Sequence, residues 1–154
     1  MAEPKIRPAM IEDAERLAID LRPADRAEII AASGPDTLAT IRQAIRVSTH
    51  CWAAEDGDGG LVALFGFAPV SLLAGIGSPW LLATPRLERI PGALTRLARR
   101  YLADIATTYP VLGNPGDARN TASIRWLQRL GFQIGPPKPY GAAGLPFHRF
   151  EMRS

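Results

Sequence analysis

A basic loop that leads into a long helix carries the clearest chemical signal in the sequence. Residues 89–94 read Arg-Ile-Pro-Gly-Ala-Leu, after an apolar segment and before an amphipathic one. The free amides that open a helix, together with the positive end of its dipole, favour a bound anion. Gly92 would let a phosphate approach the main chain closely, and Arg86 and Arg89 would add positive charge. The alternative is an ordinary surface helix whose arginine-rich side is only solvated.

A second segment, residues 120–132, has the pattern of a short capped helix followed by a strand. It reads Asn-Thr-Ala-Ser-Ile-Arg-Trp-Leu-Gln-Arg-Leu-Gly-Phe. Asn120 is of a type that caps a helix by accepting a main-chain hydrogen bond. Gly131 suits the left-handed position that ends a helix. Local physics explains most of this pattern, so the segment indicates structure before it indicates chemistry.

Three other residues carry side chains capable of catalysis, but their surroundings favour structural roles. Cys51 is the only cysteine, so it cannot form an intrachain disulfide, and it lies beside Trp52 in a stretch typical of a core strand. His50 and His148 are far apart in the sequence and are expected on strand faces. Two histidines are too few for a metal site, so we expect no metal.

Two polar loops each leave two interpretations open. Residues 117–120, Asp-Ala-Arg-Asn, form either a polar pocket on the substrate side or an Asp–Arg pair that shapes a turn. Residues 141–146 belong to a stretch rich in glycine and proline, which is expected to be loop. That loop is either a lid over a substrate or only a flexible connection.

The elements that must position these segments change from helical to strand periodicity near residue 50. An Asp-Gly turn sequence at 56–60 joins the two strands of the clearest hairpin, at 50–55 and 61–67. Apolar residues at helical spacing predict the best helix at about 92–107. Residues 114–117, Asn-Pro-Gly-Asp, are expected to form a turn. The other expected elements are helices at 11–21, 23–33, from 35 to about 45 and at 121–130, and strands at 5–8, 80–83, 110–112, 132–134 and 147–152. This order predicts an α/β fold with a mixed, mostly antiparallel sheet of six to seven strands and helices on both faces.

The composition is that of one soluble globular domain. The chain has 154 residues, of which 47% are hydrophobic and 21% charged, with a formal net charge of +3. This length fits a single domain over residues 1–154. The mild positive charge suits a small polyanion, and no clustering of aromatic and basic residues indicates nucleic acid. No apolar run approaches the roughly 20 residues of a membrane helix, and the N-terminus lacks a signal-peptide pattern, so we expect a cytoplasmic protein without a membrane partner.

The Asn-x-x-Ser-Ile…Leu-Gly-Phe pattern of residues 120–132 resembles the helix after the fifth strand in the GCN5-related N-acetyltransferase (GNAT) superfamily. Residues 6–9, Ile-Arg-Pro-Ala, and 12–18, Glu-Asp-Ala-x-x-Leu-Ala, resemble its opening strand and helix. Cys51-Trp52, Pro79-Trp80 and residues 117–123 are similar to a divergent phage- or prophage-encoded branch that includes an internal virion-associated protein of T7-like phages.

The superfamily resemblance implies a site for acetyl-CoA, held as a cosubstrate. The fourth strand would splay from the fifth, and the pantetheine arm would lie in the cleft between them. The residues implied are Leu82 and Ala83 for strand contacts, Arg89, Gly92, Ala93 and Leu94 for the pyrophosphate, and Asn120 and Ser123 for the far side of the cofactor.

Two departures from the superfamily pattern bear on activity. Leu94 stands where the phosphate loop has a small residue, so its side chain is expected to crowd the phosphate. Leu127 stands where many members have a tyrosine that protonates the leaving thiolate. Leucine donates no proton, and the expected fourth strand carries no acidic residue, so we assign no catalytic acid or base.

Two functional hypotheses follow from the resemblance. The first is an N-acyltransferase that transfers an acyl group from acetyl-CoA to an unidentified amine, largely through proximity. The second is a non-catalytic phage or prophage assembly or binding protein that retains the fold and contacts phage structural proteins. Both leave a homodimer open.

Overall fold

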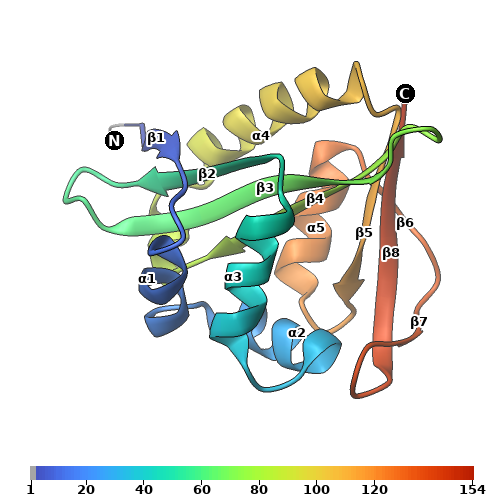
Figure 1. Ribbon diagram of the computed structural model, residues 1–154, viewed down its shortest axis with the longest axis horizontal. Helices are drawn as coiled ribbons and strands as arrows, with labels where there is room; N and C mark the ends of the chain where they lie inside the picture. The colour runs from blue at the N-terminus through green and yellow to red at the C-terminus, as the bar shows by residue number, and fades with distance from the viewer. Residues whose placement is uncertain (1–2) are drawn as a thin grey trace.

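A mixed sheet of eight strands forms the centre of the protein, as the computed structural model describes it over residues 3–154 (Figure 1). The spatial order is β1-β2-β3-β4-β5-β8-β6, and β7 pairs with β8. All neighbouring strands are antiparallel except β4 and β5. The strands are β1 Lys5–Pro8, β2 His50–Glu55, β3 Leu61–Ser71, β4 Ile76–Ala83, β5 Val111–Asp117, β6 Gln133–Ile134, β7 Lys138–Tyr140 and β8 Leu145–Arg153. The predicted fold class is confirmed, with one or two more strands than expected.

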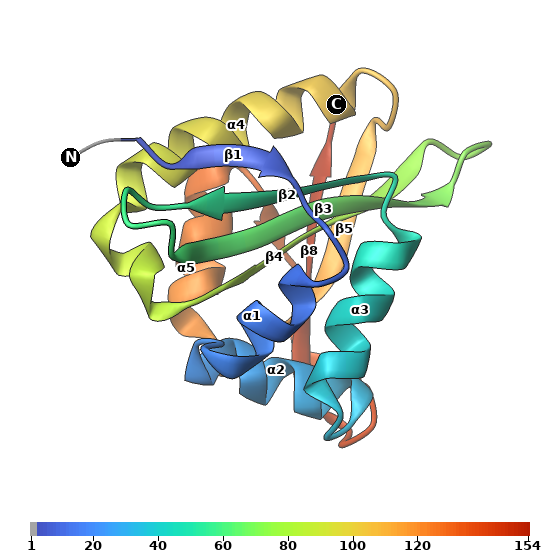
Figure 2. The ribbon, with the colours of Figure 1, turned by 60° about the vertical axis from the view of Figure 1, so that its left-hand side comes forward.

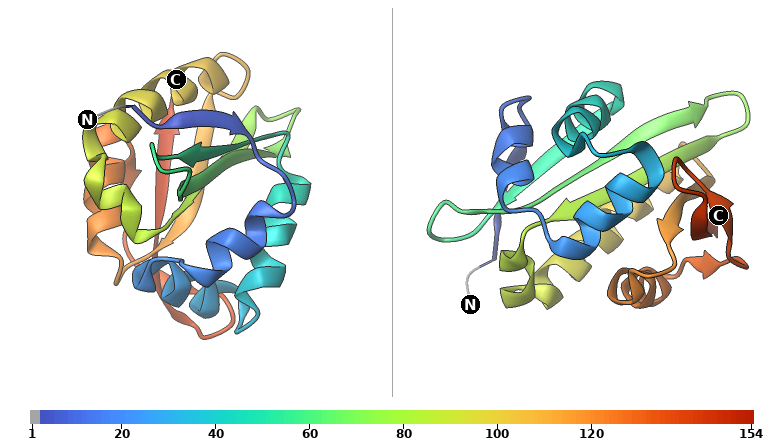
Figure 3. Two further views of the ribbon diagram at one scale, coloured as in Figure 1. Left: turned by 90° about the vertical axis from the view of Figure 1, so that its left-hand side faces the viewer. Right: turned by 90° about the horizontal axis from the view of Figure 1, so that it is seen from below.

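Helices cover both faces of the sheet (Figure 3). Three of them, α1 Asp13–Ile19, α2 Pro23–Ser33 and α3 Thr37–Val47, lie on one face. The short 3-10 helix η1 Pro85–Arg89 leads into α4 Pro91–Ala106, which lies on the other face together with α5 Thr121–Leu130. None of the helices in residues 3–154 combines the length and the apolar character needed to span a membrane.

Each face of the sheet has its own core. Leu17 and Ile41 of the first helix layer pack with Leu64 and Leu82 of the sheet. On the opposite face, α4 packs over the sheet through residues such as Leu102, which belongs to one cluster with Phe67, Leu112 and Phe150. Burial of these apolar side chains is the main favourable term in folding.

Residues 114–117 are strand and not turn, so that prediction was wrong. They belong to β5, and Asn114 and Asp117 pair with Phe150 and Phe147 of β8. The turn propensity of Asn-Pro-Gly-Asp is overridden by this long-range pairing. In addition, β4 begins at Ile76, before the strand predicted at 80–83. Strand β7 lies in the stretch rich in glycine and proline that was predicted to be loop.

The hairpin between β2 and β3 is confirmed, and its turn is bonded to the loop after β4. Asp56 Oδ1 accepts hydrogen bonds from the amides of Asp58 and Gly60 at 3.1 and 3.0 Å. Asp56 Oδ2 accepts one from Arg86 Nη1 of η1 at 2.6 Å. Two loops that are far apart in the sequence are therefore held together by one carboxylate.

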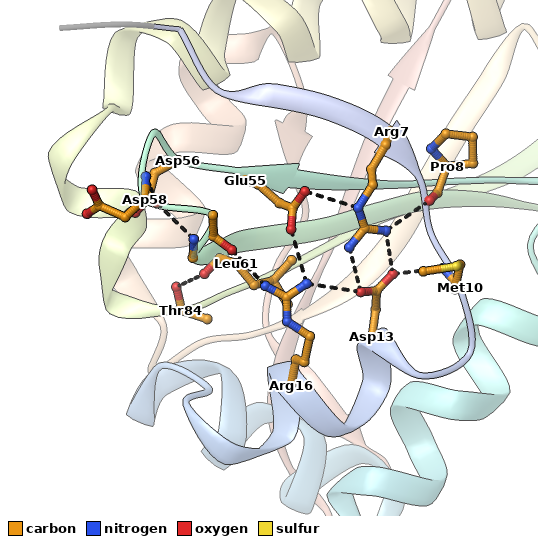
Figure 4. Close-up of polar contacts among 12 residues, drawn as sticks. Arg7, Pro8, Met10, Asp13, Arg16, Glu55, Asp56, Asp58, Leu61 and Thr84 are labelled. Carbon is orange, nitrogen blue, oxygen red and sulfur yellow. Dashed lines mark hydrogen bonds and ion pairs between the residues drawn. The ribbon is translucent and has the colours of Figure 1, made fainter.

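A charged network ties β1, α1 and β2 together (Figure 4). Arg7 donates to both carboxylate oxygens of Asp13 at 2.8 Å and to Glu55 Oε1 at 3.1 Å. The Asp13 carboxylate also accepts from the Met10 amide at 2.8 Å. Burial of Asp13 favours its neutral form, but the hydrogen bonds from Arg7 and Met10 outweigh this and hold its pKa below the usual value.

Asp13→Asn is expected to lower the free energy of unfolding by about 2 kcal/mol at neutral pH, because it removes the shorter and bidentate charge pair of Arg7 and leaves only the pair with Glu55. Urea denaturation measures this loss. Because the pKa of Asp13 is lowered, the stabilisation is present at neutral pH and is lost as the pH falls through the carboxylate range. The two proteins should therefore converge in acid. Glu151→Gln, which removes an exposed pair with Arg153, is the control and should cost less than about 1 kcal/mol.

Candidate active site

A gap between β4 and β5 is the central feature of the site (Figure 2). The two strands pair only through Ile76 with Val111 and Gly77 with Leu112. Beyond these pairs β4 carries Pro79 and β5 carries Pro115. A proline has no N–H to donate to a neighbouring strand. The parallel ladder therefore ends where these prolines begin, and the strands diverge.

The register with β3 determines which main-chain groups of β4 face the gap. The Thr84 amide bonds the Val62 carbonyl at 3.0 Å, so the even-numbered residues of β4 bond to β3 and the odd-numbered ones face away from it. Leu81 therefore turns its N–H and C=O toward the gap, whereas the main-chain groups of Leu82 belong to the ladder with β3. By the same alternation with β8, Pro115 and Asp117 of β5 face the gap.

Helix α2 crosses the open end of the gap and bonds to both strands. Asp25 Oδ2 accepts from the Ala83 amide of β4 at 2.9 Å, and the Ala83 carbonyl accepts from the Arg22 amide at 2.9 Å. One turn further along, Glu28 Oε1 accepts from the Asp117 amide of β5 at 2.8 Å. Two carboxylates of one helix thus replace the ladder that the strands do not form.

A cavity of about 300 Å³ occupies the gap and is lined by residues from both faces of the sheet. Leu81, Asn114 and Pro115 line it from the two strands. Its α4/α5 side is lined by residues that include Ala98, Tyr101, Ser123, Trp126 and Leu127, and its α2/α3 side by residues that include Glu28, Ile29, Ser33, Thr40 and Ala44. The lining of the cavity therefore extends from α4 and α5 on one face of the sheet to α2 and α3 on the other.

Glu28 is the one acidic or basic side chain among the described residues that line this cavity. Its pKa is raised to about 7. Burial is the largest cause, and the nearby charges of Asp25 and Asp117 add to it, whereas the hydrogen bond from the Asp117 amide opposes the rise. A carboxyl that titrates near neutrality can accept and release protons at physiological pH. The sequence analysis missed Glu28, because its environment comes from β5, far along the chain.

The neighbouring carboxylates differ from Glu28 because each has an arginine. Asp25 pairs with Arg22 at 2.9 Å, and Asp117 pairs with Arg119 at 2.7 Å. For Asp117, burial raises the pKa, but the hydrogen bonds and charge of Arg119 outweigh it and the pKa is lowered. The Asp–Arg interpretation of residues 117–120 therefore describes the structure, since the pair shapes the turn before α5.

The first turn of α4 presents two free amides near the predicted phosphate residues. Pro91 has no N–H, and the Leu94 amide already donates to the Ile90 carbonyl at 3.3 Å. The Gly92 and Ala93 amides donate to no other group in residues 3–154. The Leu94 side chain is only 3% exposed, so it lies on the inner side of the helix and not over these amides.

Two arginines of the basic loop have different surroundings. Arg89 is exposed beside the first turn of α4. Arg86 is engaged by Asp56 of the hairpin turn. Of these two, Arg89 is therefore the one free of an ion pair within residues 3–154, and Arg96 of α4 places its Nη1 3.5 Å from where a Cβ on Gly92 would lie.

The residues predicted on the far side of the cofactor have unequal surroundings. Asn120 caps α5 by accepting from the Ser123 amide at 3.4 Å, and its Nδ2 donates to Asp25 Oδ1 at 3.3 Å. Both ends of the Asn120 amide are thus used within the protein. Ser123 and Leu127 line the cavity, and Trp126 Nε1 donates to Thr95 Oγ1 at 2.9 Å, which joins α5 to α4.

Two further titratable groups remain neutral. Burial raises the pKa of Tyr101 to about 12, and its buried hydroxyl has no hydrogen-bond partner among the described residues. Burial likewise raises the pKa of the Cys51 thiol to about 11. The thiol is therefore protonated at neutral pH and is a poor nucleophile. Within residues 3–154 no group of three or more potential ligands is arranged to hold a metal ion.

Solved acetyltransferase structures share this fold at low sequence identity. A chimera of the spermidine N-acetyltransferase SpeG from Vibrio cholerae and hSSAT matches with a TM-score of 0.71 and 10% identity, over 99% of this chain and 96% of that chain. A GNAT superfamily phosphinothricin acetyltransferase (Pat) from Sinorhizobium meliloti, in complex with AcCoA, matches with a TM-score of 0.71 and 15% identity, over 99% of this chain and 89% of that chain. An aminoglycoside N(6′)-acetyltransferase from Legionella pneumophila matches with a TM-score of 0.71 and 13% identity, over 99% of this chain and 93% of that chain.

These likenesses show the fold: the chain has the acetyltransferase fold of the GNAT superfamily. No protein-family model and no curated protein sequence matches the chain. The matched structures lend no support to the phage-encoded branch.

The carboxyl carbon of Glu28 is expected to titrate with a midpoint near 7 in ¹³C NMR, and Glu28→Gln identifies the resonance by removing it. Because the pKa is raised in the folded state, ionisation of Glu28 destabilises the fold. The wild type should therefore lose stability relative to the Gln variant as the pH rises from about 4.5 to 7. A midpoint near 4.5 would contradict this assignment.

Proposed function

We propose that the protein is an N-acyltransferase that uses acetyl-CoA and transfers the acyl group to an amine. The observation that carries the proposal is the cavity in the gap between β4 and β5, whose lining extends from α4 and α5 on one face of the sheet to Glu28 on the other. A thioester that enters from one side and an amine that enters from the other would meet within it. Holding two reactants in this way supplies much of the rate of a bimolecular reaction.

The cosubstrate would bind through main-chain groups. The Gly92 and Ala93 amides and the Arg89 side chain would hold the pyrophosphate. Leu81 would bond the pantetheine arm, because its N–H and C=O face the gap, while those of Leu82 and Ala83 are used by β3 and α2. In support, the phosphinothricin acetyltransferase with the same fold was crystallised with AcCoA.

Glu28 would accept the proton that the amine must lose. The neutral amine nitrogen attacks the thioester carbon, its proton passes to the Glu28 carboxylate, and the carbon–sulfur bond breaks to release the thiolate. A thiol has a pKa of about 8.5, so it can leave as the anion at little cost near neutral pH. The absence of a tyrosine at Leu127 is compatible with this step.

Acetyl-CoA is expected to bind saturably in isothermal titration calorimetry, and Gly92→Asp should raise Kd by about tenfold or more, because it sets a carboxylate beside the phosphates. The Cβ at position 92 would meet only the end of the Arg96 side chain, and an acidic residue in the first turn favours the helix, so the variant should fold. Gln43→Glu adds one negative charge at an exposed position of α3, on the opposite face of the sheet from α4, and should leave Kd unchanged. The absence of heat at millimolar acetyl-CoA would refute the proposal and leave the non-catalytic hypothesis.

Acetyl transfer is expected to increase as the pH rises through about 7, where Glu28 becomes a carboxylate, and then to level off. Glu28→Gln should lower kcat on the order of 10²-fold or more and remove this inflection, while leaving Kd for acetyl-CoA unchanged. Glu12→Gln, at an exposed position before α1, is the matched control. An unchanged pH profile in the Glu28 variant would show that another group takes the proton.

A further inference from the structure

The α2/α3 side of the cavity carries a single charge in an apolar and aromatic wall. Its lining includes Ile29, Ala32, Ala44 and Trp80, with the hydroxyls of Ser33 and Thr40 as neutral polar groups. Trp80 is fixed there because its Nε1 donates to Oγ of Ser48, the residue that caps the end of α3, at 2.8 Å. A molecule on this side would therefore contact mainly carbon surfaces.

The β7–β8 connection completes this wall and is anchored to α2. The Ala142 and Ala143 amides donate to the Ala32 and Ala31 carbonyls, both at 3.1 Å. Gly141 has φ +76°, and a Cβ there would lie 2.6 Å from the Cα of Ala32, so only glycine allows this close approach. The connection is therefore attached to α2 and lies beside the cavity.

The anchored connection places two aromatic rings in contact at the cavity, tilted by 50° to each other. Tyr140 and Phe147 both line it, with ring centroids 5.1 Å apart. Phe147 is buried, whereas Tyr140 is 46% exposed and lies at the rim. With Trp80 they give this side three aromatic rings.

A molecule with several positive charges would find one free carboxylate here. Asp25 and Asp117, the acidic neighbours of Glu28, are already paired with Arg22 and Arg119. Each further ammonium group would lose water without gaining a counter-charge, which is unfavourable in an apolar site. A single amine that delivers its proton to Glu28 has no such cost.

We propose that the acceptor is a small monoamine with an apolar or aromatic body, and not a polycation such as a polyamine or an aminoglycoside. This inference rests on the proposed function for its chemistry. It separates the protein from those structural matches whose names specify polycationic substrates. The volume of about 300 Å³, at the small end of ligand cavities, fits one ring and a short amine chain beside the acyl group.

The test compares 2-phenylethylamine, spermidine and kanamycin as acceptors, with release of the coenzyme thiol as the readout. We expect kcat/KM for 2-phenylethylamine to exceed the other two by at least tenfold. Calorimetry of each amine alone supplies a readout without transfer, and 2-phenylethylamine should be the one that binds. Tighter binding and faster transfer of spermidine or kanamycin would overturn the inference and leave the acyltransferase proposal standing. Binding of acetyl-CoA without transfer to any of many amines tried would instead refute the proposed function.

Two variants test the wall and the charge separately. Tyr140→Ala should raise KM for 2-phenylethylamine by about tenfold and leave Kd for acetyl-CoA unchanged, and Tyr140→Phe should restore the wild-type value, because the ring and not the hydroxyl makes the contact. Ser33→Glu adds a second carboxylate at an exposed position that lines the cavity. It should raise kcat/KM for spermidine several-fold with little change for 2-phenylethylamine. An equal loss for all amines in Tyr140→Ala, or no gain for spermidine in Ser33→Glu, would contradict the inference.

Discussion

The ladder that β4 and β5 fail to complete determines the rest of the site. Pro79 and Pro115 remove two donors from the edge where the parallel strands would continue to pair. In most sheets such a loss would be destabilising, because buried main-chain groups need partners. Here α2 supplies acceptors for two main-chain amides. Asp25 accepts from the Ala83 amide, and Glu28 accepts from the Asp117 amide. The remaining separation becomes the cavity.

The two carboxylates of α2 have similar positions and different electrostatic states. Asp25 has a cation within 2.9 Å and further hydrogen bonds, which are the conditions for a stable buried charge. Glu28 accepts from an amide but forms no salt bridge within residues 3–154, and it lies near the negative charges of Asp25 and Asp117, with the charge of Arg119 acting from further away. One helix thus contains a structural carboxylate and a carboxylate that titrates near neutrality. Perturbed groups of this kind often mark functional sites.

The sequence predicted the parts of the fold that depend on local signals. The hairpin at Asp56, the Asn120 cap and the Gly131 helix end, which has φ +107°, are all present. The error at Asn114–Asp117 arose because a turn motif was judged without its partner strand β8. Similarly, Leu82 could not be distinguished from Leu81 as the residue facing the gap, since that depends on the register with β3.

The site was predictable only in its outline. The resemblance to acetyltransferases indicated the helix start at Gly92 and the divergence of two strands. The expected crowding by Leu94 does not occur, because the helical phase turns this side chain inward. Glu28 could not be found, since its pKa is raised mainly by burial, and that burial depends on packing against segments such as β5, whose Asp117 lies 89 positions further along the chain. The only local signal was the spacing of two acidic residues on one helix, which is common on solvated helices.

The bond between Asp56 and Arg86 also affects how an anion would be received at α4. Thr84 Oγ1 donates to the Leu61 carbonyl at 2.7 Å and accepts from the Arg86 amide at 3.3 Å, so the β4 end of the connection between β4 and α4 is attached to the β2–β3 hairpin. Ordering one residue of a mobile loop costs about 1–2 kcal/mol of conformational entropy. In this protein that entropy is lost during folding, before any ligand is present. The part of the loop from Thr84 to Arg86 is therefore ordered in advance, and that share of the ordering cost is not taken from the free energy of binding an anion at α4.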